Sequence, residues 1–287
     1  GNEKVLSPGT VIISAGAEVS DVKKVISPVL VNDIDTSIYY IDFSFHKMEL
    51  GGSVLYQTLN KVGKTTPNVE DPEYFATAFE TIQELINKGF ILAGHDISEG
   101  GMITALLEMC FGNKKGGLDV NYEDIATSNI LEILFAENPG VLIQVKKNSA
   151  VEKILTNNGI GFAKIAKPSE KRILNIRKNK RLYVFDIDDL RDIWFKTSYL
   201  LDRKQSGEVC AKERLKNYKK QPLDIEFTKS FSGKLSQYNI LPITRGKGGV
   251  KAAIIREKGT NGEREMAYAL FLAGFDVKDV HMTDLAS

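Results

Sequence analysis

Residues 90–110 restrict the fold more than any other stretch of the chain, because they combine a strand pattern and a helix pattern with a polar turn between them. Residues 90–93 are apolar and predict a short buried strand. Positions 102, 103, 106, 107 and 110 are apolar at helical spacing. The octapeptide GHDISEGG at residues 94–101 is therefore predicted to lead from a strand into a helix.

The composition of this turn suits a phosphate group and its metal ion. The start of a helix presents unpaired N–H groups, and adjacent glycines such as Gly100 and Gly101 allow an anion to come close. A carboxylate such as Asp96 can bind a hard cation. Asp and Ser are also common helix caps, and Gly is a common turn residue. The pattern alone leaves two interpretations open, a nucleotide site and a purely structural turn.

Composition limits the class of protein. With 287 residues, 43% of them hydrophobic, the chain is long enough for one full domain and additional segments. Its formal net charge of +1 gives no indication of a nucleic acid or an acidic membrane as partner. Cys110 and Cys210 form neither a disulfide framework nor a zinc motif, which is typical of a reducing compartment. The sequence also shows no signal peptide and no apolar run long enough to span a membrane. We therefore expect a cytoplasmic protein. Because the chain begins with Gly1 rather than Met, we also expect a segment of a longer one.

Up to about residue 170 the sequence alternates strand and helix patterns. Strands are predicted at residues 10–18, 39–43 and 140–145, and helices at 53–62 and about 148–157. The best-defined helix follows Asp71, an expected N-cap, with Pro72 at its first position and Gly89 at its end. Its predicted buried stripe consists of Phe75, Phe79, Ile82, Leu85 and Ile86.

Two further zones follow. Residues 171–249 carry a basic surface, which we interpret as a solvated face because no RNA-binding signature accompanies it. A helix at about 188–203 has an apolar stripe around Trp194 that is expected to pack on a neighbouring domain, and residues 230–249 have the composition of an interdomain linker. From residue 250, the order strand, loop, helix and strand predicts the opening βαβ unit of a parallel sheet.

Several segments of the sequence together resemble one family of enzymes. They are PGTVIIS at residues 8–14, LGGS at 50–53, GHDISEGGM at 94–102, ENPGVLIQV at 137–145 and REKGTNGEREMAYALFLAGFDVKDVHMTDL at 256–285. In these motifs the chain resembles, nearly end to end, the large single-polypeptide form of phosphoribosylformylglycinamidine synthase. The last segment is similar to the beginning of that family's glutaminase domain.

The resemblance implies a fold and a domain organisation. The expected fold class is α+β: an aminoimidazole-ribotide-synthase-like C-terminal domain with a mixed sheet in an α/β/α arrangement, then a helical connector and a truncated βαβ unit of a class I glutamine amidotransferase. The implied divisions are residues 1–187 for the synthetase C-terminal-like domain of the second repeat, 188–249 for the connector and linker, and 250–287 for the start of the glutaminase domain.

The family's activity is the expected function. Its members are ATP-dependent carbon–nitrogen ligases of purine biosynthesis. They convert formylglycinamide ribonucleotide, ATP and glutamine to formylglycinamidine ribonucleotide, ADP, phosphate and glutamate through an iminophosphate. The resemblance implies ATP or ADP and Mg²⁺ as cofactors. The implied partners are the remaining domains of the same polypeptide, formylglycinamide ribonucleotide and glutamine, and they include neither nucleic acid nor a membrane.

Carried over position by position, the resemblance assigns site residues within the octapeptide. Asp96 matches the family's magnesium ligand and Ser98 its contact to the nucleotide phosphate. Gly100 and Gly101 would allow the backbone to approach the nucleotide. His95 is expected to orient the turn, since phosphoryl transfer depends mostly on positioning and electrostatics. No residue of this chain is assigned a catalytic role.

Two other matching segments have alternative interpretations. Lys47 with residues 51–53 is a candidate contact for a substrate phosphate, although Met48 and Glu49 depart from the polar and basic residues of the family's loop. Glu137 is a candidate for the substrate cleft. For both segments the alternative is a purely structural turn.

Glutamine hydrolysis is not expected from these residues. A class I glutaminase needs a nucleophilic Cys on a strand-to-helix elbow, with a His and an acidic partner. Cys110 lies in a predicted helix, Cys210 in a polar connector, and His281 with Asp284 has no thiol near it in the sequence. Two functions remain: a ligase segment that is inactive alone, or a non-catalytic nucleotide-binding or docking module that stabilises the full-length protein. In either case we expect weak or no binding of MgADP by this chain alone.

Overall fold

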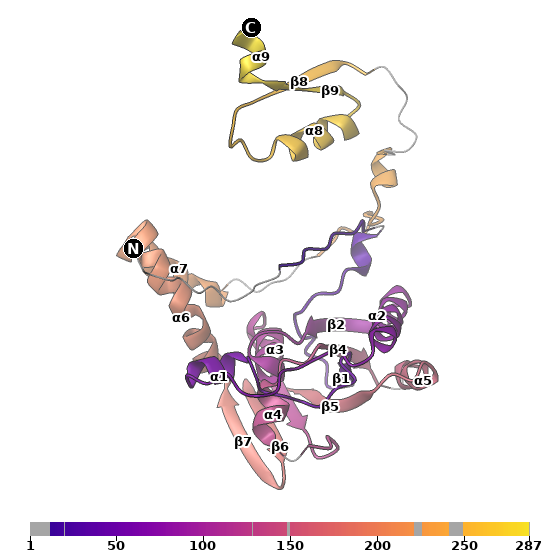
Figure 1. The fold of residues 1–287 in the computed structure, drawn as a ribbon, viewed down its shortest axis with the longest axis vertical. Helices are drawn as coiled ribbons and strands as arrows, with labels where there is room; N and C mark the ends of the chain where they lie inside the picture. The colour runs from indigo at the N-terminus through magenta and orange to yellow at the C-terminus, as the bar shows by residue number, and fades with distance from the viewer. Residues whose placement is uncertain are drawn as a thin grey trace, which may run out of the picture. The chain divides into compact units, whose positions relative to one another are not determined.

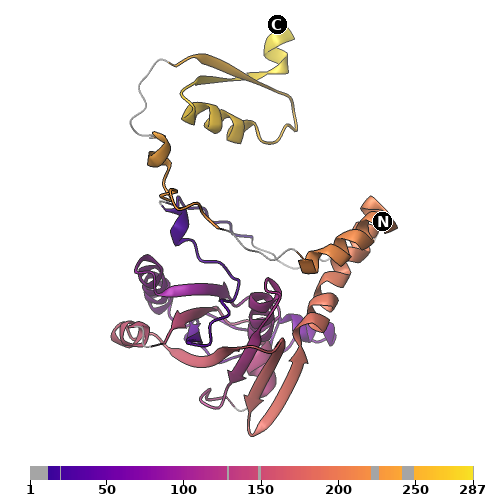
Figure 2. The ribbon, with the colours of Figure 1, turned by 180° about the vertical axis from the view of Figure 1, so that it is seen from behind.

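The computed structural model describes residues 12–19, 21–127, 129–147, 150–220, 226–240 and 249–286. The chain divides into two compact units, one of residues 24–225 and one of residues 1–23 with 226–287. Figures 1 and 2 show both units. The domain boundaries after residues 187 and 249 that the family resemblance implies stay a prediction.

A mixed sheet forms the centre of the larger unit. Its strands in the described residues lie in the order β2–β4–β1–β5–β3–β6–β7. All neighbours are antiparallel except β3 and β6, which run parallel. The strands are β1 (Thr36–Asp42), β2 (Ile91–Asp96), β3 (Gly117–Asn121), β4 (Gly140–Lys146), β5 (Phe162–Ser169), β6 (Ile173–Lys178) and β7 (Arg181–Asp186).

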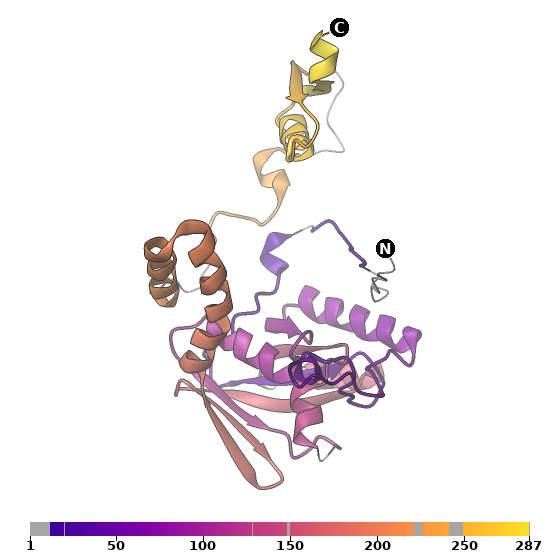
Figure 3. The ribbon, with the colours of Figure 1, turned by 60° about the vertical axis from the view of Figure 1, so that its left-hand side comes forward.

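Helices cover both faces of the sheet, and each face has its own apolar core. Along β1, Ile38 and Tyr40 belong to the core that contains α3 and α4, whereas Tyr39 and Ile41 belong to the core with α2 and α5. This alternation follows from the period of two in a strand. Figure 3 shows α2 and α3 beside the strands. The predicted α/β/α arrangement around a mixed sheet is confirmed. The helices are α1 (Val54–Thr58), α2 (Pro72–Asn87), α3 (Gly101–Phe111), α4 (Ile130–Phe135) and α5 (Val151–Asn157).

The predicted signals of α2 are confirmed, and its buried face matches the predicted stripe except at Phe79. The Asp71 side chain accepts hydrogen bonds from the backbone N–H groups of Glu73 and Tyr74, at 2.9 and 3.1 Å. Phe79, predicted to be buried, is 51% exposed. The helix fully buries Ala78, Thr81, Ile82 and Leu85. Ile82 and Leu85 of the predicted stripe are buried, and Phe75 and Ile86 pack against the same core, so the buried face differs from the prediction at Phe79 and also includes the small residues Ala78 and Thr81.

Three other predicted elements differ from the structure. Residues 12–19 form no strand, and the exposed Ile12 and Ile13 side chains have no apolar layer to pack on. The helix predicted at 53–62 is shorter, because Asn60 takes a left-handed φ of 53° after α1 ends. Within the predicted linker, residues Leu235–Tyr238 form the 3₁₀ helix η3, and residues 241–248 lie outside the described part. Two further 3₁₀ helices are η1 (Val22–Lys24) and η2 (Tyr218–Lys220).

The connector begins as two helices attached to the sheet-containing unit, α6 (Ile187–Ser206) and α7 (Glu208–Asn217). Asp188 Oδ1 lies 3.1 Å from Arg172 Nε and 2.8 Å from Arg191 Nη2. The same two arginines donate to carbonyl oxygens at the end of α3: Arg172 to Cys110 and Arg191 to Phe111. The arginines therefore satisfy terminal carbonyl groups of α3 and fix the first turn of α6 against it.

The smaller unit contains the predicted βαβ segment. Strands β8 (Lys251–Arg256) and β9 (Asp276–His281) are parallel, with Ala253 opposite Lys278 in the register, and α8 (Glu263–Leu272) connects them. The helix α9 (Met282–Ala286) follows. No residue of α8 is buried, so the apolar face of this unit is uncovered in the described part of the chain. The unit therefore has the connectivity of a parallel α/β domain without the layer that would bury it.

Candidate functional site

The octapeptide leads from a strand into a helix, as predicted, but the strand β2 extends through its first three residues to Asp96. Asp96 is the last residue of β2, and its side chain is 72% exposed. His95 is largely buried beside it: Nδ1 lies 2.8 Å from the Asp96 carbonyl oxygen and 3.4 Å from Oδ1. His95 Nε2 lies 3.2 Å from Glu108 Oε2 on α3. These contacts fix the ring of His95 and leave the Asp96 carboxylate open to solvent.

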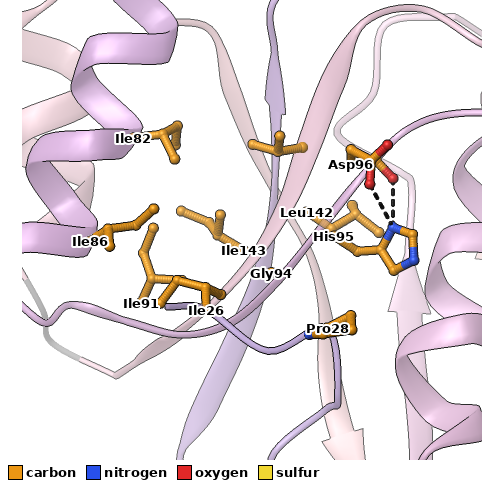
Figure 4. A pocket seen from close by; sticks show the side chains of 11 residues that line it. Ile26, Pro28, Ile82, Ile86, Ile91, Gly94, His95, Asp96, Leu142 and Ile143 are labelled. Atoms are coloured by element: carbon orange, nitrogen blue, oxygen red, sulfur yellow. Dashed lines mark hydrogen bonds and ion pairs between the residues drawn. The ribbon is translucent and has the colours of Figure 1, made fainter. Parts of the chain in front are cut away.

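A cavity of about 380 Å³ lies beside this strand end (Figure 4). Figure 4 shows Asp96 and His95 at one end and isoleucines of α2 and the strands at the other. The cavity is therefore mostly apolar, with one carboxylate and one imidazole among its lining groups. It is lined by Ile26, Pro28, Ile82, Ile86, Ile91, Gly94, His95, Asp96, Val141, Leu142 and Ile143.

The two glycines of the turn are required by backbone geometry and by packing. Gly100 has a φ of 86° and Gly101 a φ of 71°, which L side chains rarely adopt. A Cβ atom on Gly101 would lie 2.7 Å from the Leu134 carbonyl oxygen, and one on Gly100 would lie 2.4 Å from Thr104 Oγ1. The glycine pair thus has a clear structural reason, and its predicted contact with a nucleotide stays a prediction.

The amide groups of this turn are already partly engaged within the protein. The Gly101 N–H donates to the Ser98 carbonyl oxygen at 3.0 Å, and the Gly100 N–H donates to Glu137 Oε1 at 2.9 Å. Neither Asp96 nor Ser98 caps α3 through its side chain, because the N-cap position is Gly100. The exposed side chains of the turn are those of Asp96, Ser98 and Glu99, of which the first two were predicted to contact a ligand.

The second glycine turn, at residues 51–53, offers no open amide. The N–H groups of Gly51, Gly52 and Ser53 donate to carbonyl oxygens of Thr65, Val62 and Leu50, respectively. The Ser53 side chain is buried, donates to the Leu50 carbonyl oxygen at 2.7 Å and caps α1. The structural interpretation of this turn is therefore favoured over a substrate-phosphate contact.

Glu137 has a structural role that no sequence pattern predicted. Its Oε1 accepts hydrogen bonds from Val54 N, at the start of α1, and from Gly100 N, at the start of α3. The only sequence signal is a Glu–Asn pair directly before the buried strand β4. Glu137 thus brings together the two glycine turns that the sequence placed far apart.

Neither cysteine is placed as a nucleophile. Cys110 is buried in α3, and burial raises the pKa of its thiol to about 12. Cys210 is exposed in α7. His281 lies at the end of β9, where its backbone N–H donates to Asp284 Oδ2. Over the described ranges, no group of three or more His, Cys, Asp or Glu residues is placed to share a metal ion. None of the helices described there is long and apolar enough to span a lipid bilayer.

Comparison with known proteins defines the class of the fold. Residues 43–177 match the family model described as AIR synthase related protein, C-terminal domain. Residues 249–287 match the model of a CobB/CobQ-like glutamine amidotransferase domain. Together with the mixed sheet and its helices, these matches show an AIR-synthase-related C-terminal domain followed by a glutamine-amidotransferase-like segment.

Comparison with curated proteins is more specific. The chain is 35% identical over 310 residues to a probable phosphoribosylformylglycinamidine synthase of Caenorhabditis elegans, covering 99% of this chain and 22% of that protein. It is 31% identical over 294 residues to the human phosphoribosylformylglycinamidine synthase, covering 100% of this chain and 22% of that protein. The chain thus spans about a fifth of these relatives' length. The chain is thus similar along its whole length to one segment of these relatives, and the resemblance found from its motifs is confirmed.

Solved structures also match part of the chain. One is Thermotoga maritima PurL complexed with FGAR, with 16% sequence identity and a TM-score of 0.48, covering 59% of this chain and 30% of that chain. Another is T. maritima PurL complexed with ATP, with 14% identity and a TM-score of 0.46, covering 59% and 28%.

Proposed function

We propose that the chain is part of an ATP-dependent ligase that converts formylglycinamide ribonucleotide, ATP and glutamine to formylglycinamidine ribonucleotide, ADP, phosphate and glutamate. The observation that carries the proposal is the exposed Asp96 at the end of β2, with Ser98 two residues later and the glycine turn into α3 after it, in a chain similar along its whole length to these synthases.

The residues of the turn fit a magnesium–nucleotide complex. Mg²⁺ is usually held by one or two carboxylates together with phosphate oxygens and water, so an exposed Asp96 is a sufficient contribution from one domain. When bound, the ion would neutralise phosphate charge. Ser98 would donate from its hydroxyl group to a phosphate oxygen without adding charge. Further ligands would come from the remaining domains of the same polypeptide, since the described residues hold no cluster of metal ligands.

The glutamine-hydrolysing residues would lie outside this chain. The buried thiol of Cys110 and the helical position of Cys210 both argue against a nucleophile here. The proposal includes a cytoplasmic location, which the two free cysteines support because thiols stay reduced in that compartment.

A second function is favoured by a separate observation. Gly100 and Gly101 use their N–H groups within the protein, which leaves few donors for a phosphate group. A nucleotide bound here would then stabilise the assembled protein without taking part in the reaction.

Substituting Asp96→Asn in the complete enzyme separates the two functions. The measurements are ammonia-dependent turnover, retained nucleotide and Tm, with Glu99→Gln as the control because Glu99 is an exposed carboxylate in the same turn. For the catalytic site we expect a loss of turnover of about 100-fold or more with an unchanged Tm. Loss of nucleotide and a lower Tm with normal turnover would support the stabilising module. If none of the three quantities changed, Asp96 would not belong to a nucleotide site.

A further inference from the structure

One carboxylate oxygen connects two turns that are distant in the sequence. Glu137 Oε1 accepts from Val54 N and from Gly100 N, each at 2.9 Å. These donors lie 83 and 37 residues before Glu137. A charged acceptor makes stronger hydrogen bonds than a neutral one, and both donors are at helix starts, where a negative charge is favourable. Glu137 therefore fixes the start of α3 relative to the start of α1.

The next residue, Asn138, holds the loop that precedes α1. It is buried, its Oδ1 accepts from Glu49 N at 3.3 Å, and its Nδ2 donates to the Lys47 carbonyl oxygen at 2.9 Å and to Ser44 Oγ at 3.2 Å. Because Asn138 is rigidly held by these contacts, Glu137 extends from a fixed backbone. We call Glu137 and Asn138 together the Glu–Asn clamp.

We propose that Glu137 is a positioning residue, which sets the backbone of residues 96–101 so that Asp96 and Ser98 meet one nucleotide phosphate and its metal ion in a single geometry. The inference rests on the proposed nucleotide site. Gly100 and Gly101 both have positive φ values and no side chain, so beyond the hydrogen bond from Gly101 N to the Ser98 carbonyl oxygen the turn has little conformational restraint of its own. The hydrogen bond from Gly100 N to Glu137 supplies a restraint from outside the turn.

Two substitutions distinguish positioning from a direct effect of charge. Glu137→Gln keeps an oxygen at the same reach and loses the charge, whereas Glu137→Asp keeps the charge and shortens the side chain by one methylene group. Glu132→Gln is the control, because Glu132 lies in the preceding helix and its side chain accepts hydrogen bonds from Thr127 and Asn129 instead of from the two helix starts.

The first measurement is the Kd of MgADP for the complete enzyme. If the length of the Glu137 side chain matters most, Glu137→Asp should weaken MgADP binding about tenfold. Glu137→Gln should weaken it about threefold, because a neutral acceptor replaces a charged one. The control should bind as the unaltered enzyme does. Equal or tighter binding by Glu137→Asp than by Glu137→Gln would overturn the proposal.

The second measurement is amide hydrogen exchange in the 287-residue chain. Glu137→Asp should speed exchange at residues 54–58 and at residues 98–104 together, while α2 stays protected. Faster exchange in only one of the two segments would contradict the clamp.

Asp96→Asn provides the reference for the nucleotide site itself. If it abolishes MgADP binding while both Glu137 variants bind normally, the nucleotide site stands and positioning by Glu137 is wrong. If Asp96→Asn has no effect on binding, the nucleotide site fails and the positioning role falls with it.

Discussion

Trp194 of α6 donates its indole N–H to Oε1 of Glu108 on α3, with Nε1 and Oε1 3.1 Å apart. The other carboxylate oxygen of Glu108 lies 3.2 Å from His95 Nε2, and His95 Nδ1 lies 2.8 Å from the carbonyl oxygen of Asp96. Trp194 also packs on Phe111, with ring centroids 5.8 Å apart. The predicted connector helix is therefore linked, through two side chains, to the strand end that carries Asp96.

Removing the indole N–H should weaken this link. Trp194→Phe keeps most of the ring packing and leaves Glu108, which is 27% exposed, with one contact fewer. We expect the free energy of unfolding to fall by about 1 kcal/mol, measured by urea denaturation. Ile193→Ala, at an exposed neighbouring position of α6, is the control and should change it by less than about 0.5 kcal/mol. An equal effect of both substitutions would show that the hydrogen bond contributes nothing specific.

Removing the charge of Asp188 should destabilise the attachment of α6. The side chains of Arg172 and Arg191 are 15% and 7% exposed, so they would lose their shared counter-charge while remaining mostly buried. Because Asp188 itself is partly exposed, we expect Asp188→Asn to lower the free energy of unfolding by about 1–3 kcal/mol, which is less than for a fully buried ion pair. Asp189→Asn, one residue further in the same helical turn, should cost at most about 0.5 kcal/mol. Similar losses in urea denaturation of the two variants would contradict this role of Asp188.

Two glycines with the same φ should respond differently to a methyl group. Gly89 and Gly101 both have a φ of 71°, but a Cβ on Gly89 would meet nothing within 4 Å. We expect Gly89→Ala to lower the free energy of unfolding by about 1 kcal/mol, from backbone strain alone. Gly101→Ala should cost about 2–4 kcal/mol, because its Cβ would overlap the Leu134 carbonyl oxygen. Thermal denaturation of the two variants measures the difference, and equal costs would show that the backbone near Leu134 adjusts freely.

The two thiols should differ in their reactivity. At pH 8, a thiol reagent should modify only Cys210 in the native chain and both cysteines after denaturation. Modification of both cysteines before unfolding would be incompatible with a buried Cys110.

The raised pKa of Cys110 also predicts a loss of stability in alkali. Burial raises it to about 12 from an ordinary value of 9.0, so above pH 9 the unfolded chain loses this proton while the native chain keeps it. The contribution of this group to the free energy of unfolding is complete below pH 9 and is lost as pH rises from 9 towards 12. Urea denaturation across this range should show a smaller decline for Cys110→Ala than for the unaltered chain. Identical slopes would contradict the predicted difference in ionisation.

Local chemistry determined several elements directly from the sequence. Asp71 and Pro72 start α2 because a capping carboxylate and a proline satisfy the first turn of a helix without neighbours from elsewhere. The GHDISEGG turn was placed between β2 and α3 for a similar reason, since glycines at positive φ mark a change of direction. The βαβ order of β8, α8 and β9 also followed from contiguous patterns. The wider α/β/α arrangement came from resemblance to a family, and the structure confirmed it.

Tertiary structure alone decided which side chains hold the candidate site in place. The contacts of Glu137 with Val54 and Gly100 join residues that no local pattern relates, and the exposure of Phe79 depends on how closely α2 approaches the sheet. The sequence by itself determined the start of α2, the turn into α3 and the order of β8, α8 and β9, because those signals act over a few neighbouring residues. The strand order, the buried face of each helix and the partner of each turn were decided by packing between segments far apart in the chain, where volume and hydrogen bonding must be satisfied together.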